Sequence, residues 1–219
     1  MKGENPALWK GGLEAVLKPI TRKNVKHHAA MHYDDIPTFM VALKASDAIA
    51  ARALELTILT ASRTSEVLKA TSDEFDLNAG QWVLSADRMK SGRPQTVPLS
   101  LRADEIVREM RCASTSPFIF PGQNPARPLS NMAMTMLLRR MNQNDITVHG
   151  FRSTFRDWAG DCSAFPREVA EAALSHSVGD AVERSYRRKN ALEKRRLLMQ
   201  AWSDYCSGTN SADVVLLYG

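Results

Sequence analysis

The sequence predicts an α+β domain that is mainly helical and carries a small antiparallel β-sheet. Apolar residues recur at helical spacing in much of the region from Pro37 to Cys206. Between Phe75 and Leu99 the pattern changes to short strand-like runs on either side of a turn-rich segment. The chain has 219 residues, of which 44% are hydrophobic and 24% charged. This length and composition are typical of a globular protein with a sizeable core.

Two helices are expected at the start of this domain, followed by a third, shorter one. The apolar stripe of the first two consists of Phe39, Met40, Leu43, Ala50, Ala53, Leu54 and Ile58. These positions lie near offsets of three, four and seven, which place side chains on one helix face. Ser62 is placed to cap the third helix, so that Arg63 stands at its start and Glu66 in its first turn.

A β-hairpin with a basic tip is expected next. Trp82–Leu84 and Thr96–Leu99 have the composition of strands, and the turn-rich residues Lys90–Pro94 separate them. The short apolar run Phe118–Phe120 is expected to add a third strand. The sheet therefore stays small.

Further helices are expected from Ser130, which is placed as an N-cap, to about Cys206. The last of them is expected to begin with a capping box made by Asn190 and Glu193. It is expected to end before the helix-breaking residues Gly208–Ser211.

The chain is expected to divide into three parts. Residues 1–36 mix Gly, Pro, Lys, His and Arg without a sustained period, which is typical of a linker or N-terminal extension. Residues 37–206 form the domain, and residues 207–219 form a C-terminal tail with a short apolar run. No stretch approaches the roughly 20 apolar residues of a membrane-spanning helix. We therefore expect a cytoplasmic protein with no membrane partner.

Positive charge is concentrated near the C-terminus. The net charge of +5 permits a polyanionic partner without requiring one. Seven cations fall within thirteen residues: Arg184, Arg187, Arg188, Lys189, Lys194, Arg195 and Arg196. Contact with a DNA backbone explains this run better than a solvated basic helix does, although the second explanation stays open.

The most informative window runs from His149 to Trp158. On a helix with about 100° per residue, Phe151, Phe155 and Trp158 share one side. His149, Arg152 and Arg156 cluster on roughly the opposite side. An ordinary amphipathic helix with a solvated basic face would also produce this pattern, so the window needs support from elsewhere in the chain.

That support comes from Arg63, from Lys90 at the hairpin tip, and from His176 followed ten residues later by Tyr186. Together with the His149 window, these residues resemble the tyrosine recombinase family, specifically the catalytic domain of phage and genomic-island integrases. The resemblance runs from about Asn5 to Trp202. Its most specific pieces are residues 60–66, 88–100, 149–158 and 174–186.

The resemblance implies a role for each matching residue. The expected catalytic groups are two arginines, a lysine, two histidines and a tyrosine nucleophile: Arg63, Arg152, Lys90, His149, His176 and Tyr186. Glu66 matches an acidic residue that supports the first arginine. The expected DNA contacts are Arg93, Arg156, Arg187 and Arg188. The chain departs from the usual family pattern at Ala61, Gln95 and Ser177, where Gly, His and Lys are frequent.

The chemistry of DNA cleavage suits these residue types. A tyrosine with an ordinary pKa near 10 is phenolate in only about one molecule in a thousand at pH 7, so Tyr186 needs cationic help. Two arginine forks, Arg63 and Arg152, match the non-bridging oxygens of a phosphodiester. His149 can accept the phenolic proton, and Lys90 can protonate the leaving hydroxyl as a general acid. This chemistry needs no nucleotide, metal or other cofactor.

The resemblance also implies partners. They are double-stranded DNA attachment sites, a homotetramer on paired sites, a separate N-terminal DNA-binding domain upstream and accessory DNA-bending proteins, with the protein on the nucleoid. Two alternatives stay open: a type IB topoisomerase, which shares the phosphotyrosine chemistry, and a DNA-binding module that never cuts. The sequence does not predict the target site or the preference for integration or excision.

Overall fold

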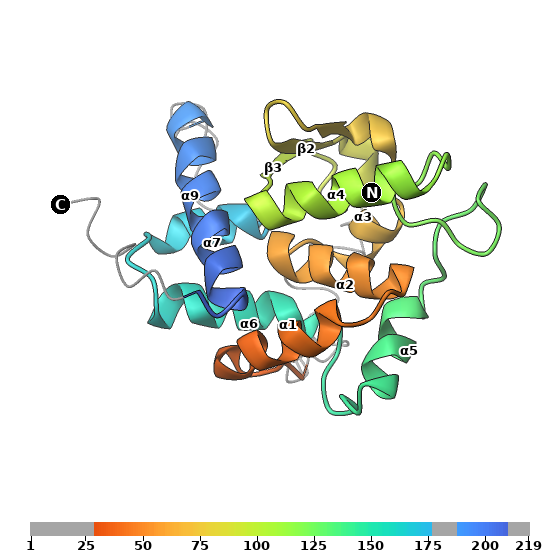
Figure 1. Cartoon of the computed structure of the whole chain (residues 1–219). Helices are drawn as coiled ribbons and strands as arrows, with labels where there is room; N and C mark the ends of the chain where they lie inside the picture. Colours follow the sequence, from red (N-terminus) through yellow and green to blue (C-terminus); the bar gives the residue numbers. More distant parts are fainter. Residues whose placement is uncertain (1–28, 177–187, 210–219) are drawn as a thin grey trace, which may run out of the picture.

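The structure is a computed structural model that describes residues 29–176 and 188–209. The predicted fold class is confirmed, because helices surround one small antiparallel sheet (Figure 1). The α-helices of this part are α1 (Ile36–Lys44), α2 (Ile49–Thr60), α3 (Thr64–Leu68), α4 (Leu101–Ala113), α5 (Ala133–Arg140), α6 (Gly150–Asp161), α7 (Arg167–Ala173) and α9 (Arg188–Cys206). The strands are β1 (Phe75–Asp76), β2 (Gln81–Leu84) and β3 (Gln95–Pro98), and the 3-10 turns are η2 (Tyr33–Asp35), η3 (Ser72–Glu74) and η4 (Ala86–Arg88).

Helix α2 is the centre of the core. It contacts α1, α3, α4, α5, α6 and α9, and in Figure 1 it lies between α4 and α1. Ten of its twelve residues are buried. Among them, the hydroxyls of Thr57 and Thr60 donate hydrogen bonds to the carbonyls of Ala53 and Leu56, at 2.8 and 2.6 Å. A helix buried on nearly every side fixes the position of whatever follows its C-terminal end, and here that is Arg63.

The sheet confirms the predicted hairpin but not the predicted third strand. Strands β2 and β3 pair antiparallel, with Trp82 opposite Val97. The strand on the other side of β2 is β1, where the Phe75 ring stacks on Trp82 with ring centroids 5.2 Å apart. The prediction for Phe118–Phe120 was wrong, because this run forms only an isolated bridge from Phe118 to Thr71.

Several helix boundaries differ from the predictions. Helix α4 was not predicted, although Ser100 caps it by accepting a hydrogen bond from the Ala103 N–H at 3.3 Å. The cap of α3 is Arg63 rather than Ser62. Helix α9 begins at Arg188, so Asn190 lies inside the helix and cannot form the expected capping box. The predicted end of this helix is confirmed, since α9 stops at Cys206, ahead of Gly208 at φ +70°.

Residues 29–36 pack against α6, although the expected domain boundary left them in the linker. The carbonyl of Ala29 accepts from the Thr147 N–H at 3.0 Å, and the Thr154 hydroxyl donates to the Met31 carbonyl at 2.6 Å. A Cβ atom on Gly150 would lie only 2.2 Å from the Ala29 oxygen. This contact requires glycine at the start of α6.

Helix α9 closes the core from the side opposite α5 (Figure 1). Trp202 is fully buried, donates from Nε1 to the Ile58 carbonyl at 2.8 Å, and packs on Trp158 with ring centroids 4.9 Å apart. In the part of the chain that the structure describes, none of the helices has the length and apolar character needed to cross a membrane.

Candidate active site

Arg63 lies between the end of α2 and the start of α3, as the N-cap residue of α3. The intervening residue Ala61 adopts a left-handed conformation at φ +49°, which turns the chain sharply after the buried helix. Glu66 then holds Arg63 at both ends: its carboxylate accepts from the Arg63 backbone N–H at 2.8 Å and from Nη1 at 2.7 Å. Glu66 is buried, so this pairing fixes the arginine before any ligand arrives.

Arg152 lies in the first turn of α6 and is buried, with 6% of its surface exposed. Its Nη1 donates to the carbonyl of Ala61, and its Nη2 donates to the carbonyl of Leu174 at 2.5 Å. One guanidinium group therefore joins the end of α2 to the turn that follows α7. Both acceptors are neutral backbone groups.

The two arginines lie close enough to repel each other. Burial and, after it, the positive charge of Arg63 lower the pKa of Arg152 to about 10, although Glu66 and Glu171 act in the opposite direction. Arg152 still carries its charge at neutral pH. An anion between the two guanidinium groups would relieve both the burial cost and the repulsion.

His176 follows α7 and is held by its own helix. Its backbone N–H donates to the Glu171 carbonyl at 2.9 Å, and its ring Nδ1 lies 2.6 Å from the Glu171 carboxylate. Ser175, just before it, is in the left-handed region at φ +58°. Because a carboxylate only accepts, this contact places a proton on Nδ1, so Nε2 is an acceptor in the neutral ring and a donor in the imidazolium form.

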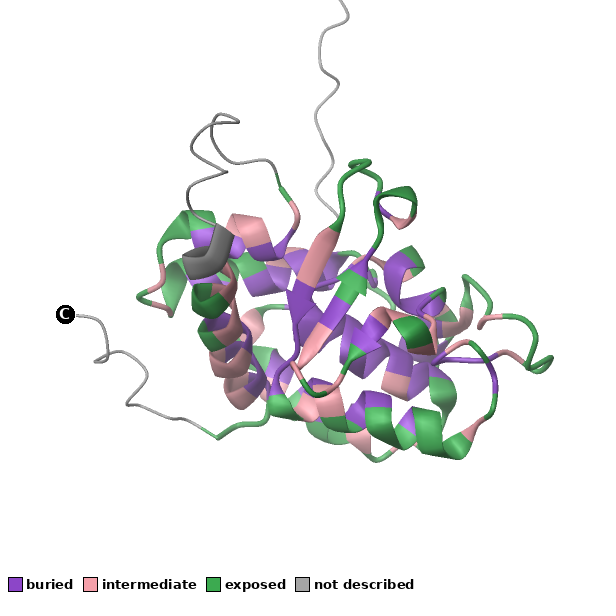
Figure 2. Cartoon of the chain, turned by 90° about the horizontal axis from the view of Figure 1, so that it is seen from above, coloured by how far each residue is buried: buried purple, intermediate pink, exposed green. Residues whose placement is uncertain are grey.

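The hairpin loop that carries Lys90 and Arg93 is anchored at its base and exposed at its tip. Both side chains are exposed, and Figure 2 shows this loop projecting from the buried strands. At the base, Arg88 donates from Nη2 to the Glu66 carbonyl at 2.8 Å and from Nη1 to the Lys69 carbonyl, and it pairs with Glu74 at 3.4 Å. Arg88 thus ties the hairpin to α3. The sequence motif contained this residue but gave it no role.

His149 and Arg156 flank Arg152 on α6. His149 is the N-cap residue and is exposed, and its carbonyl accepts from the Arg152 backbone N–H at 3.2 Å. Arg156 lies about one turn beyond Arg152, is exposed, and pairs with Asp157 at 3.4 Å. The structure thus confirms the predicted helix, with its aromatic face in the core and its basic residues on the other side.

The nucleophile and part of the basic run cannot be placed. Tyr186 and Arg187 lie outside the described residues, and for Arg188 the structure gives only its backbone position at the start of α9. Of the predicted site, the structure brings together Arg63, Arg152 and the turn before His176.

Two cations of the basic run face the protein instead of solvent. Arg195 donates to the Thr96 carbonyl at 2.8 Å, and burial lowers its pKa. Arg196 donates to the Ala79 carbonyl at 3.1 Å. The prediction that the run contacts DNA stays a prediction, and the structure adds that these two guanidinium groups bind backbone carbonyls of β3 and of the turn before β2. Lys194 is exposed.

The described residues assemble no site for a metal ion. Within residues 29–176 and 188–209, no three His, Cys, Asp or Glu side chains lie together in a group that could hold one.

A small sheet framed by helices, with two arginines held at the junction of α2, α6 and α7, defines the class of protein. The model of the phage integrase family matches residues 29–193, so the chain belongs to this family. The match confirms the resemblance inferred from the motifs.

Two curated relatives come from Escherichia coli K12. The chain is 34% identical over 206 residues to the prophage integrase IntA, a match that covers 92% of this chain and 50% of the relative. It is 33% identical over 181 residues to the prophage integrase IntZ, with coverage of 81% and 45%. The chain thus spans about half the length of the curated relatives it matches.

Solved structures share the fold. The integrase from mycobacterium phage Brujita superimposes with a TM-score of 0.60 at 16% identity, over 86% of this chain and 62% of that one. A lambda integrase dimer bound to a COC′ core site superimposes with a TM-score of 0.55 at 17% identity, over 71% of this chain and 60% of that one.

Proposed function

We propose that this chain is the catalytic domain of a site-specific DNA recombinase, an integrase that breaks and rejoins DNA through a tyrosine. The observation that carries the proposal is the junction of Arg63 and Arg152. Arg152 is buried beside Arg63 and, within the described residues, donates to the neutral carbonyls of Ala61 and Leu174, so the pair offers net positive charge to an anion. A DNA phosphodiester is such an anion, and planar guanidinium groups match its two non-bridging oxygens.

In the first step the Tyr186 oxygen attacks the scissile phosphorus. A bond forms between them, the bond from phosphorus to the 5′ oxygen breaks, and the DNA is left joined to the protein as a 3′ phosphotyrosine. His149 accepts the phenolic proton and Lys90 donates a proton to the departing 5′ oxygen. Arg63, Arg152 and His176 stabilise the charge that develops on the non-bridging oxygens.

In the second step a 5′ hydroxyl from another DNA end attacks the phosphotyrosine. The phosphodiester is restored and Tyr186 leaves with its proton returned. The energy of the broken bond is kept in the intermediate, so the exchange consumes no nucleotide. Lys90, at an exposed loop tip, can move toward the leaving oxygen once DNA is bound.

The partners follow from the same proposal. The substrates are double-stranded attachment sites, and the active assembly is a homotetramer on two paired sites, with accessory DNA-bending proteins and a place on the nucleoid. A lambda integrase tetramer bound to a Holliday junction shares the fold with a TM-score of 0.56 at 14% identity, over 78% of this chain and 50% of that one. We propose an upstream DNA-binding domain joined by a linker, and place the start of the catalytic domain before Ala29, since residues 29–36 pack on α6.

The proposal is tested with a nicked suicide duplex that carries a candidate attachment site, incubated in EDTA and separated on a denaturing gel. Wild type should give a shifted covalent band, Tyr186→Phe should give none, and the control Tyr205→Phe should keep it. A band that survives Tyr186→Phe refutes the proposed nucleophile. DNA binding without any band, in this chain and with an upstream domain attached, favours the module that never cuts, and plasmid relaxation without strand exchange favours a topoisomerase.

A further inference from the structure

The turn from Ala173 to His176 is held from several directions at once. Arg152 binds the Leu174 carbonyl, and Glu171 binds both the backbone and the ring of His176. A third contact comes from the sheet. The side chain of Gln95 donates from Nε2 to the Ala173 carbonyl at 3.3 Å, and its Oε1 accepts from the Ser175 hydroxyl.

Gln95 lies at the base of the hairpin loop. It is the first residue of β3 and pairs with Leu84, the last residue of β2, so this pair closes the loop that carries Lys90. Its side chain is half-buried. An amide is suited to this position because it can donate and accept at the same time. The same amide therefore touches the base of the Lys90 loop and the turn before His176.

The turn depends on such contacts. Ser175 has φ +58°, a conformation that costs free energy for any residue with a Cβ atom. Such a conformation persists where the surrounding contacts determine it. Within the described residues, the side-chain hydrogen bonds from the sheet to this turn come from Gln95.

We propose that Gln95 is a positioning residue that latches the hairpin bearing Lys90 to the turn bearing His176. The latch fixes the base of the Lys90 loop against the turn that bears His176, while the tip with Lys90 stays exposed. Gln95 itself need not touch DNA. The catalytic part of this inference rests on the proposed function, whereas the latch between β3 and the turn does not.

The latch is tested first by amide hydrogen exchange on the full chain without DNA. The N–H groups of Leu174, Ser175 and His176 all donate within their own turn, so their protection reports its opening. Gln95→Ala should raise their exchange about tenfold, the effect expected from losing roughly one net hydrogen bond. The matched control is Gln81→Ala, which changes a half-buried glutamine at the other end of the same pair of strands, opposite Pro98. It should leave their exchange unchanged.

Two further variants separate the latch from a general loss of stability. Gln95→Glu keeps an acceptor for the Ser175 hydroxyl but cannot donate to Ala173, so its exchange should lie between wild type and Gln95→Ala. Exchange in α4 should stay at the wild-type level in all of them. Unchanged exchange at residues 174–176 in Gln95→Ala overturns the latch, and so does a uniform rise that includes α4.

The catalytic consequence is read from the rate of covalent adduct formation on the nicked duplex. Gln95→Ala and Ser175→Ala should each slow it about tenfold, and the double variant should be no slower than the worse single one, since both break the same contact. Additive slowing of the two variants overturns a shared role. Wild type that forms no adduct counts against the proposed function, and the exchange result then decides the latch alone.

Discussion

Arg152 illustrates how single residues prepare this site. A buried cation is normally neutralised by a carboxylate, because an unpaired charge is costly to bury. Here the nearby carboxylates are engaged elsewhere, Glu66 with Arg63 at 2.7 Å and Glu171 with His176 at 2.6 Å. Arg152 donates instead to the carbonyls of Ala61 and Leu174. The residue is therefore oriented in advance, and its charge is left available to a ligand.

This arrangement predicts that oxyanions stabilise the free protein. Sulfate at about ten times its dissociation constant should raise the melting temperature by roughly 3–6 °C, because a ligand that binds only the folded state adds about 1.4 kcal/mol. The measurement is thermal unfolding in sulfate against chloride at matched ionic strength. Arg63→Gln should abolish the difference, whereas Arg156→Gln, which changes an exposed arginine on α6, should retain it. An equal effect of chloride would contradict the prediction.

Spacing along the chain predicted which residues belong to the site but not how they are held. Arg63, Lys90, Arg152 and His176 could be recognised from local motifs. The roles of Arg88 and Gln95 could not, because each binds groups far away in the sequence: Gln95 and Ser175 are 80 positions apart. No periodicity in a single sequence carries that information.

At the scale of elements, the start of α6 depends on one glycine. Gly150→Ala would place a methyl group 2.2 Å from the Ala29 carbonyl and force residues 29–30 away from the helix. We expect a loss of about 3 kcal/mol in the free energy of unfolding, of the size seen for overpacking against a backbone that cannot move freely.

Gly160 in the same helix provides the matched control. A Cβ atom there meets nothing within 4 Å, so Gly160→Ala should stabilise the protein by about 0.5–1 kcal/mol through helix propensity. Urea unfolding measures both variants. Destabilisation of similar size in the two would show that the contact with Ala29 is not what restricts position 150.

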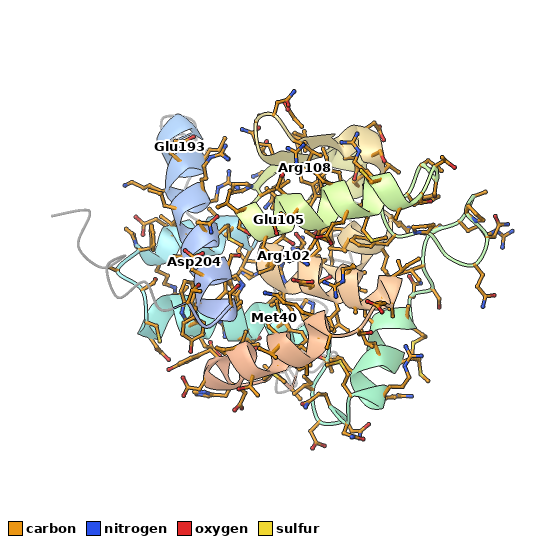
Figure 3. The ribbon with its side chains drawn as sticks, in the orientation of Figure 1. Met40, Arg102, Glu105, Arg108, Glu193 and Asp204 are labelled. Carbon is orange, nitrogen blue, oxygen red and sulfur yellow. The ribbon has the colours of Figure 1, made fainter. Side chains whose placement is uncertain are left out.

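A second element-level prediction concerns the pairing of α2 with α4. Glu55 is fully buried on α2 and binds Arg52 at 2.5 Å and Arg102 of α4 at 2.9 Å. In Figure 3 Arg102 lies between the two helices, with Glu105 beside it. Arg102 also binds Glu109, which is half exposed.

Glu55→Gln should lower the free energy of unfolding by about 3 kcal/mol, because it removes the charge partner of Arg52 and the buried partner of Arg102. Glu109→Gln changes the exposed end of the same network and should cost less than about 0.5 kcal/mol. Chemical unfolding in urea measures the difference. Comparable losses would mean that the buried carboxylate is not the link between the helices.

The elements also show where sequence patterns fall short. The amphipathic spacing of α1 and α2 predicted both helices, and the turn residues around Lys90 predicted the hairpin. Helix α4 carried a similar signal, with Ala103, Ile106, Val107 and Met110 buried on one face, yet it was overlooked. Strand β1 has only two residues, and such a strand is defined by its backbone pairing with β2 rather than by any pattern of its own.

At the scale of the whole molecule, the basic run of α9 contains both exposed cations and cations that bind the sheet. Lys194 is exposed, so Lys194→Gln should reduce the slope of log affinity for DNA against log salt by about 0.9 and leave unfolding unchanged. Arg195 binds the sheet, so Arg195→Gln should lower the free energy of unfolding by about 1–3 kcal/mol and leave the slope unchanged. Fluorescence anisotropy over a salt series and urea unfolding test the pair. A reduced slope for Arg195→Gln would assign that residue to DNA after all.

The anchoring of Arg152 by backbone carbonyls affects which substitutions this part of the protein can accept. Every amino acid supplies the same backbone carbonyl, so the acceptors at positions 61 and 174 do not depend on which side chains stand there. Substitutions at either position leave the anchor in place as long as the main chain keeps its course. The anchor itself therefore constrains the side chain only at Arg152, whereas Ala61 and Leu174 are constrained by burial and, at Ala61, by the left-handed backbone.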